Sequence, residues 1–295
     1  MSIDKRYLQS VFFMLLSSVG LTITGLLAKV GFQTLTLNSL VFWRFFVSFL
    51  ICLSLLWLFR KLDEEVDLGQ IKSHVLRAIF LLLSQYSFYY YLEKATLLDA
   101  VALLNTGPLF IPMLERWIIG TRVPMSAWVG ILVSFLGVML VLQPENSIIA
   151  WIGLLGLFGG FCQGMSQVLF GMNTKREASD IGVFVLMLLL AVFSAIPYFL
   201  SGDRTLVEGQ ELDWSVIGIL IGLGVASVAN QLFRAEAYKR ESPSRLAAFL
   251  YISVLLAGLF DWCFLGVVPD FVSIVGAVLI ILGGIIKVYY GTVQS

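Results

Sequence analysis

Residues 103–117 read LLNTGPLFIPMLERW, a segment that is apolar enough for lipid but holds Asn105, two prolines and a charged end. Pro108 and Pro112 each remove a backbone hydrogen-bond donor and clash with the preceding turn, so a helix here should bend near its middle. In a membrane protein, such a bend either lines a cavity or is filled by neighbouring helices. This segment on its own is compatible with both alternatives.

The composition of the whole chain favours an integral membrane protein. Of 295 residues, 59% are hydrophobic, and the mean hydropathy is +0.94, whereas ordinary soluble domains are roughly 45 to 50% apolar. The 19 basic and 19 acidic residues cancel, so the chain lacks the basic surface that nucleic-acid binding requires. We therefore expect no nucleic-acid partner.

Ten apolar runs are each long enough to cross the membrane as a helix, since the ~30 Å hydrocarbon core takes roughly 20 residues. Their hydrophobicity is continuous rather than alternating, which favours an all-α bundle over a barrel. The predicted spans are residues 9–30, 39–59, 75–92, 98–118, 126–142, 151–172, 181–200, 215–234, 246–266 and 271–290.

The distribution of Lys and Arg predicts how these spans are oriented. Basic residues concentrate in the N-terminal segment and in alternate connections, including the polar residues 60–74, while the opposite connections hold only Lys94 and Arg204. Lys and Arg are enriched on the cytoplasmic side of a bilayer. We therefore predict that both termini are cytoplasmic.

The chain also matches itself at two offsets. A shift of 146 residues places 108–140 on 254–286, and a shift of 142 places the first two spans on the sixth and seventh. Because each copy has an odd number of spans, the second enters the membrane from the opposite face. Residues 1–145 and 146–295 are thus predicted to be inverted repeats, an arrangement common in secondary transporters, whose substrate site lies near the midplane.

Several patterns give the chain a resemblance to a known family. They are Trp43-Arg44 early in the second span, GPLFIPMLERWIIGTRVP at 107–124, WVGILVSFLGVMLV at 128–141 and its echo FVSIVGAVLIILGG at 271–284. In these patterns the chain resembles the drug/metabolite transporter superfamily, in its ten-span type with two EamA-like halves. The second half departs from the pattern, with Val254 and Leu186 where Pro108 and Arg44 would fall.

This resemblance implies ten transmembrane helices in two inverted five-helix repeats, with a central cavity lined by spans one, three, four, six, eight and nine. It also implies a multi-pass protein of the bacterial inner membrane that moves small organic solutes, often outward.

Polar and aromatic side chains within the spans are candidates for contact with a solute. An unpaired amide in hydrocarbon is costly, so Asn105 has to face protein or a wet cavity. Tyr86 and Tyr90 share a helix face and would stack on a flat or cationic solute; an aromatic belt at the outer interface is the competing interpretation. The candidate substrate-binding residues are Arg44, Gln85, Tyr86, Tyr90, Asn105, Gln163, Gln167, Asn230 and Tyr251.

Charged residues inside the spans suggest further roles. Arg44 lies on the order of 9 Å into the second span. A charged side chain at this depth costs free energy unless it is paired or hydrated. Arg44 therefore either contacts an anionic substrate group or has a structural role. The shift of 146 places Asp261 on Glu115, and these acids would anchor gates or simply lie at the membrane interface. The candidate gating and helix-kink residues are Pro108, Pro112, Glu115 and Asp261.

Glycines recur at helix-packing intervals in two spans. Gly156, Gly160 and Gly164 are four residues apart, as are Gly218 and Gly222. Small residues at this spacing let two membrane helices approach closely. We therefore expect both sets to lie at helix–helix contacts.

The sequence contains little that an enzyme would need. The metalloprotease motif HExxH and the hydrolase motif GxSxG are absent. The three cysteines lack the spacing of a metal site, and the single histidine, His74, is predicted to be a solvated loop residue. We therefore expect no catalytic residues, no metal and no cofactor.

These observations favour a secondary transporter, namely an exporter of small organic metabolites such as amino acids, working by alternating access around a central cavity. The Tyr and Trp content and the neutral amides favour planar amphipathic solutes, with nucleoside-like or cationic metabolites as alternative cargo. A non-transporting scaffold subunit and an enzyme acting on lipid-linked substrates are the alternative functions. The expected partners are the solute and membrane lipid, and the sequence is compatible with a homodimer.

Overall fold

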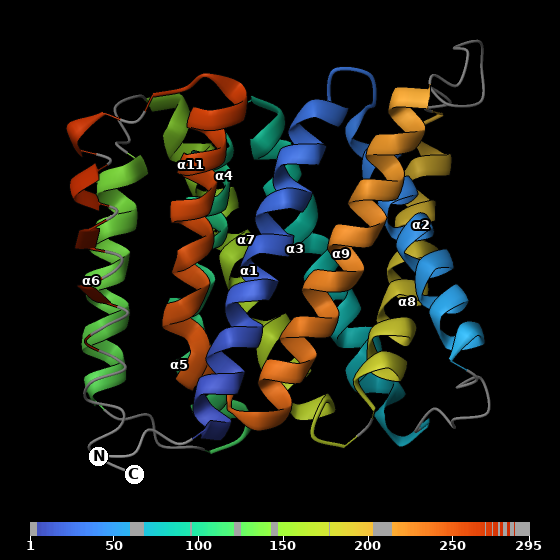
Figure 1. Cartoon of the computed structure of the whole chain (residues 1–295), viewed down its shortest axis with the longest axis horizontal. Helices are drawn as coiled ribbons and strands as arrows, with labels where there is room; N and C mark the ends of the chain where they lie inside the picture. Colours follow the sequence, from blue (N-terminus) through green and yellow to red (C-terminus); the bar gives the residue numbers. More distant parts are fainter. Residues whose placement is uncertain are drawn as a thin grey trace.

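The computed structural model of the chain describes residues 5–59, 68–94, 96–120, 125–142, 147–176, 178–202 and 214–268, and scattered positions from 270 to 286. Within these residues the chain forms helices and turns, with no strand. The long helices run side by side as a bundle (Figure 1). By length and composition, four of them can cross a membrane: α1 (Lys5–Gly31), α2 (Leu37–Leu58), α8 (Ser179–Leu200) and α9 (Trp214–Arg240).

The remaining helices follow most of the other predicted spans. Three are continuous: α3 (Ile71–Lys94), which follows the short η1 (Leu68–Gln70), α6 (Met125–Leu142) and α7 (Ser147–Asn173). The described positions between 271 and 286 are also helical. His74 was predicted to be a solvated loop residue, and this prediction is wrong. Because α3 begins at Ile71 rather than at residue 75, the imidazole is inside the helix and fully buried, with its Nδ1 3.4 Å from Asn173 Nδ2.

Two of the predicted spans are interrupted, the fourth near its middle and the ninth near its start, where the helix changes type. The fourth divides into α4 (Leu97–Leu104) and α5 (Gly107–Ile118), and the ninth into α10 (Pro243–Leu246), η2 (Ala247–Tyr251) and α11 (Ile252–Leu265). In the fourth span the break falls at Asn105 and Thr106, before both prolines. Pro108 lies in the first turn of α5, where the missing backbone donor is harmless.

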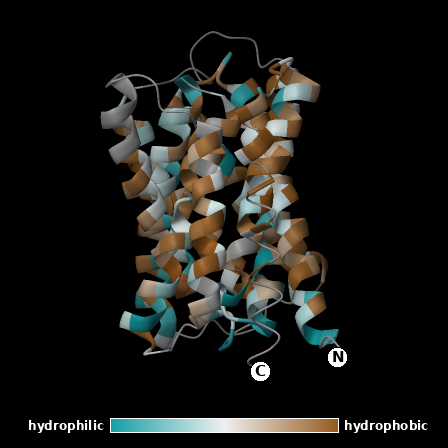
Figure 2. Cartoon of the chain, turned by 90° about the vertical axis from the view of Figure 1, so that its left-hand side faces the viewer, coloured by the Kyte–Doolittle hydropathy of each residue, from teal (hydrophilic) through white to brown (hydrophobic). Residues whose placement is uncertain are grey.

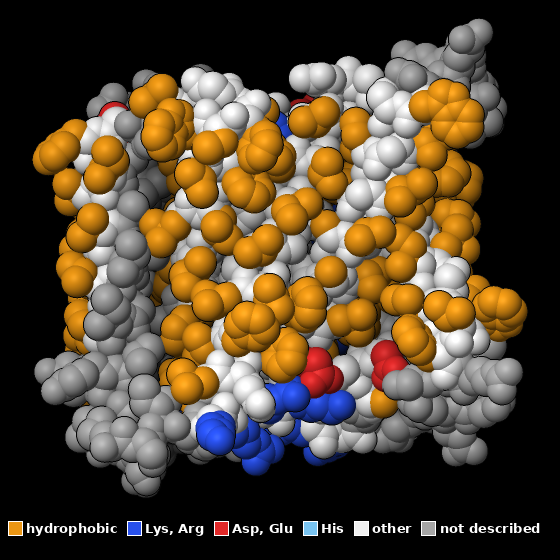
Figure 3. Space-filling view, in the orientation of Figure 1, with side chains coloured by type: hydrophobic (Ala, Val, Ile, Leu, Met, Phe, Trp, Pro, Cys, Tyr) orange, Lys and Arg blue, Asp and Glu red, His pale blue; other side chains and the backbone are white. Residues whose placement is uncertain are grey.

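The outer face of the bundle is apolar over most of its height. Large hydrophobic side chains cover the face seen in Figure 3, and among the exposed ones Trp117 is 74% and Phe199 72% accessible. Hydrophilic residues gather towards the two ends of the helices (Figure 2). Lys and Arg concentrate at the lower end in Figure 3, where α1 begins and α9 ends. A broad apolar belt between polar ends is the surface expected of a protein in a bilayer.

The most extensive helix contacts join the first half of the chain to the second. α1 packs mainly on α9, α3 on α7, and α2 on α8, and α5 also packs on α7. The core is therefore built between the halves rather than separately within each of them.

The glycine stripe of α7 lies against the break between α4 and α5. A Cβ atom on Gly160 would be 1.9 Å from Thr106 Oγ1 and 3.1 Å from Gly107 N, and one on Gly164 would be 3.0 Å from Gly107 O. Close packing at this stripe is thus confirmed. The same expectation for Gly218 is wrong, since nothing lies within 4 Å of a Cβ built there.

The Gly160→Ala substitution should lower the free energy of unfolding by about 1 to 3 kcal/mol, because the added methyl overpacks the contact with Thr106 and the backbone of Gly107. Thermal unfolding of the purified protein in detergent measures this effect. Gly218→Ala is the matched control and should be neutral or raise stability by up to about 1 kcal/mol, as alanine favours helix over glycine. Equal effects of the two substitutions would contradict the packing described for α7.

Candidate functional site

Arg44 links three helices at the centre of the bundle. It lies on α2 with 4% of its surface exposed. Its Nε donates to Ser227 Oγ at 2.7 Å on α9, and its Nη1 donates to Gln85 Oε1 at 2.6 Å and to Tyr89 Oη, both on α3. The guanidinium carbon also lies 4.9 Å from the centroid of the Phe45 ring. All these partners are neutral, so the positive charge of Arg44 is solvated by protein without being neutralised.

A second buried arginine, Arg234, lies on α9 and is 2% exposed. Its Nε donates to Ser17 Oγ at 3.1 Å on α1, and this hydroxyl in turn donates to Asn230 Oδ1 at 2.7 Å. The Nη2 atom of Arg234 is buried and has no hydrogen-bond partner among the described residues. Arg234 therefore resembles Arg44 in being a deeply placed cation bonded to uncharged groups.

The two arginines line one polar cavity at the interface between the halves. Its volume is about 10 Å³, which is room for about one water molecule. The cavity is therefore closed to a solute in this structure. Six helices, α1, α2, α3, α7, α8 and α9, contribute the lining residues, which are Leu21, Arg44, Phe45, Leu81, Gln85, Gln163, Met187, Asn230, Gln231 and Arg234.

This lining brings together four of the predicted substrate-binding residues: Arg44, Gln85, Gln163 and Asn230. The contributing helices differ from those that the family resemblance implied. α2 and α8, the second and seventh predicted spans, line the cavity, while no described side chain of the fourth and ninth spans does so.

Asn105 instead joins the two broken spans. Its Nδ2 donates to Val101 O at 2.7 Å and to Ser253 Oγ at 2.9 Å, and Ser253 Oγ donates to Leu250 O at 2.5 Å. An amide in the turn after α4 thus bonds a hydroxyl at the start of α11. Tyr251 is fully buried at the same break, and its Oη has no hydrogen-bond partner in the described part of the chain.

Three other predicted residues lie away from the cavity lining. Gln167 is buried and accepts a hydrogen bond from Tyr238 Oη at 2.8 Å. Tyr86 is partly buried on α3. Tyr90 is 37% exposed, with Lys94 Nζ 3.7 Å from the centroid of its ring. The position of Tyr90 near the end of α3 fits the aromatic-belt interpretation.

Arg234 and Gln231 were not among the predicted binding residues, although the sequence contains a signal for them. Ser227, Asn230, Gln231 and Arg234 recur at the spacing of one helix face. Gln231 also accepts a hydrogen bond from Arg77 Nη2 at 3.2 Å, and the Arg77 guanidinium stacks over the Phe170 ring at 3.3 Å. A polar stripe on an otherwise apolar membrane helix could therefore have identified the cavity face of α9.

Glu115 and Asp261 make matched contacts near opposite ends of the bundle. Glu115 Oε1 accepts from the backbone N of Ser244, in the first turn of α10, at 3.2 Å. Asp261 Oδ2 accepts from the backbone N of Leu98, in the first turn of α4, at 2.7 Å. Both carboxylates are buried, and a negative charge is favourable at a helix N-terminus. Each contact connects the first half of the chain to the second.

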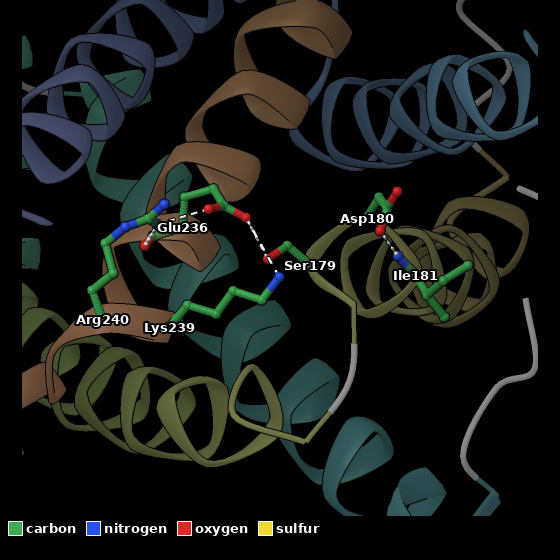
Figure 4. Close-up of polar contacts among 6 residues, drawn as sticks. All are labelled: Ser179, Asp180, Ile181, Glu236, Lys239 and Arg240. Carbon is green, nitrogen blue, oxygen red and sulfur yellow. Dashed lines mark hydrogen bonds and ion pairs between the residues drawn. The ribbon is translucent and has the colours of Figure 1, made fainter. Parts of the chain in front are cut away.

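A separate group of charges ties α8 to α9 (Figure 4), at the end of the bundle that is drawn lowest in Figure 1. Glu236 accepts from Arg240 Nη1 at 2.7 Å and from Ser179 Oγ at 2.9 Å, and lies 3.7 Å from Lys239 Nζ. These side chains are partly exposed, and such ion pairs typically add at most about 1 kcal/mol. Over the ranges that the structure describes, no group of three or more His, Cys, Asp or Glu side chains could hold a metal ion.

Comparison with known proteins identifies the family. The profile of the EamA-like transporter family matches residues 8–143 and, a second time, residues 149–289. The chain belongs to the EamA-like transporter family. A member of this family is a multi-pass membrane transporter rather than an enzyme, and the relatives of this chain place it in the bacterial inner membrane.

Several curated proteins are similar to this EamA-like transporter over most of its length. The chain is 25% identical to the pseudopaline exporter CntI of Pseudomonas aeruginosa, over 92% of this chain and 93% of that protein. It is 25% identical to a riboflavin transporter of Rhizobium johnstonii (82% and 78%) and 22% identical to an S-adenosylmethionine uptake transporter of Rickettsia prowazekii (97% and 94%). A crystal structure with 16% identity shares the fold, with a TM-score of 0.74 over 97% of this chain and 99% of that chain.

A double-mutant cycle should detect the bond between the two broken spans. Asn105→Ala and Ser253→Ala should each lower the unfolding free energy, and the double variant should lose about 1 kcal/mol less than the sum, because one hydrogen bond is removed in all three. Thermal unfolding in detergent is the measurement. Strictly additive losses would show that the two side chains do not interact.

Proposed function

We propose that the chain is a secondary transporter that moves small organic metabolites across the inner membrane by alternating access around the polar cavity. The observation that carries this proposal is the convergence of polar side chains from both halves on one buried cavity that is closed in this structure. A scaffold subunit would not need charged and amide groups from four helices, α2, α3, α7 and α9, at one place, because each buried polar group costs free energy.

The proposed architecture is ten transmembrane helices in two inverted repeats, residues 1–145 and 146–295, with both termini cytoplasmic. The double match to the family profile supports the division. The two breaks also support it, since Asn105 and Tyr251 are 146 residues apart, the spacing at which the chain matches itself. The basic residues at the lower end of the bundle favour that end as the cytoplasmic one.

Two hydrogen bonds across the core are related to each other by the same 146-residue offset. Ser17 on α1 donates to Asn230 on α9 at 2.7 Å, and Ser84 on α3 donates to Gln163 on α7 at 3.2 Å. Adding 146 to Ser17 and to Ser84 gives Gln163 and Asn230. Equivalent bonds that exchange the two halves are expected of repeats related by a two-fold axis in the membrane plane.

The matched acids give this architecture a pair of gates. Leu98 and Ser244, whose backbone N atoms bond Asp261 and Glu115, are again 146 residues apart. We assign Glu115 to a cytoplasmic gate and Asp261 to an outer gate. Pro108 and Pro112 would help α5 to tilt about the break at Asn105, since prolines weaken a helix locally.

For the cargo and direction, we propose export of amino acids and related planar metabolites. The relatives are named as transporters of three different small metabolites, one as an exporter and one as an uptake transporter. Reconstitution into proteoliposomes tests this proposal by measuring both uptake and efflux of amino acids, nucleosides and quaternary amines. Transport above that of protein-free liposomes is expected, and its absence for every solute would favour the scaffold alternative.

The gate assignment predicts opposite changes in accessibility for the two acids. In a chain without its native cysteines, a Leu21→Cys reporter in the cavity should react slowly with an impermeant maleimide, because both gates are closed. Asp261→Ala should raise labelling from the outer side several-fold, and Glu115→Ala should raise labelling from the cytoplasmic side. Labelling of right-side-out and inverted vesicles measures this difference, and increases from the same side in both variants would refute the assignment.

A further inference from the structure

The central cavity carries two positive charges that the protein does not neutralise. Arg44 and Arg234 both line it, and both are at least 96% buried. Across the described residues neither guanidinium pairs with a carboxylate; their hydrogen-bond acceptors are the hydroxyls of Ser227, Tyr89 and Ser17 and the amide oxygen of Gln85. An arginine at membrane depth is costly unless an anion or water accompanies it.

The described carboxylates that are buried are committed elsewhere. Glu115 and Asp261 bond the helix N-termini at Ser244 and Leu98, near opposite ends of the bundle. Glu236, which is only partly buried, bonds to Lys239 and Arg240. Among the described residues, the cavity lining contains amides, apolar side chains and the two arginines, but no acid.

Both arginines have hydrogen-bond donors left over. The described bonds of Arg44 use its Nε and Nη1 atoms, and none of them uses its Nη2. The Nη2 atom of Arg234 is buried and without a partner in the described chain. A guanidinium presents its donors in a planar fork that matches the oxygens of a carboxylate or a phosphate. The unused donors are therefore suited to an oxyanion.

We propose that the cavity binds a small organic anion, whose carboxylate or phosphate accepts hydrogen bonds from Arg44 and Arg234. The neutral amides Gln85, Gln163 and Asn230 bond the uncharged polar groups of the same solute. This inference rests on the proposed transport function and specifies its substrate class. Because the closed cavity has room for about one water, the anion enters when one gate opens and the surrounding helices separate.

The two positive charges also predict the order in which the cavity binds solutes of different charge. A zwitterionic amino acid places its carboxylate on the arginines, but its ammonium meets only amide oxygens in the described lining. A quaternary amine brings a third positive charge to a cavity that already holds two. The order of preference is therefore anion, then zwitterion, then cation.

A charge-resolved transport assay on the full chain tests this order. Proteoliposomes are offered an equimolar library that pairs succinate and glycerol 3-phosphate with neutral, zwitterionic and quaternary-amine metabolites, and mass spectrometry measures the solutes gained over protein-free liposomes. Enrichment of anions is expected, and the two named anions distinguish carboxylate from phosphate. Enrichment of zwitterionic, neutral or cationic solutes without anions would overturn the anion inference but keep the transporter, whereas no enrichment of any solute would overturn the transporter itself.

Variants of the arginines locate the anion site. Arg44→Gln and Arg234→Gln should each lower anion transport roughly tenfold to a hundredfold, as expected for losing a charged hydrogen bond. Lysine at either position should restore part of it. Arg176→Gln, at an exposed turn after α7, is the matched control and should transport anions normally.

A purely structural role for the arginines would lower the transport of all charge classes equally, and this result would also overturn the inference. Size-exclusion chromatography identifies a glutamine variant that fails to fold. In that case the charge preference of the unaltered protein, together with the lysine variants, decides the question.

Discussion

The structure depends on one constraint, which is that polar side chains buried in a membrane bundle have to bond each other because lipid offers no partner. Here those bonds run across the interface between the two halves of the chain. Arg44 reaches Ser227 on α9, Ser17 reaches Asn230, and Asn105 reaches Ser253. The polar groups therefore hold the halves in register and also provide the cavity between them.

The contacts that we propose as gates differ from those that hold the bundle together. α1 packs on α9 and α3 on α7 along extended faces, whereas the described bonds of Glu115 and Asp261 to the backbone N–H groups of Ser244 and Leu98 are local. A charged hydrogen bond is worth roughly 1.5 to 3 kcal/mol, little enough to break during a transport cycle. One end can thus open while the packed helices stay together.

Much of the fold could be predicted from the sequence, because the length of each apolar run predicts a membrane helix. The internal repeat also relates Glu115 to Asp261 from the sequence alone. The helix break at Asn105 was harder to place, since the prolines that suggest a bend are tolerated in the first turn of α5 and beyond. Helix periodicity shows which residues share a face, but not which faces meet. For that reason Tyr90 was listed as a cavity residue although it is exposed. Arg234, in contrast, shares a helix face with Asn230, and the sequence alone could have added it to the candidates.

The central claim is that two equivalent halves open one cavity alternately to opposite sides. Distances between spin labels at Glu93 and Trp262, near the upper end, and at Lys239 and Arg116, near the lower end, test this claim most directly, since the four positions are exposed and the pairs are related by the 146-residue repeat. Adding a transported solute should lengthen one distance and shorten or preserve the other. If both distances lengthened together, or neither changed in a protein that transports, alternating access between the two halves would be contradicted.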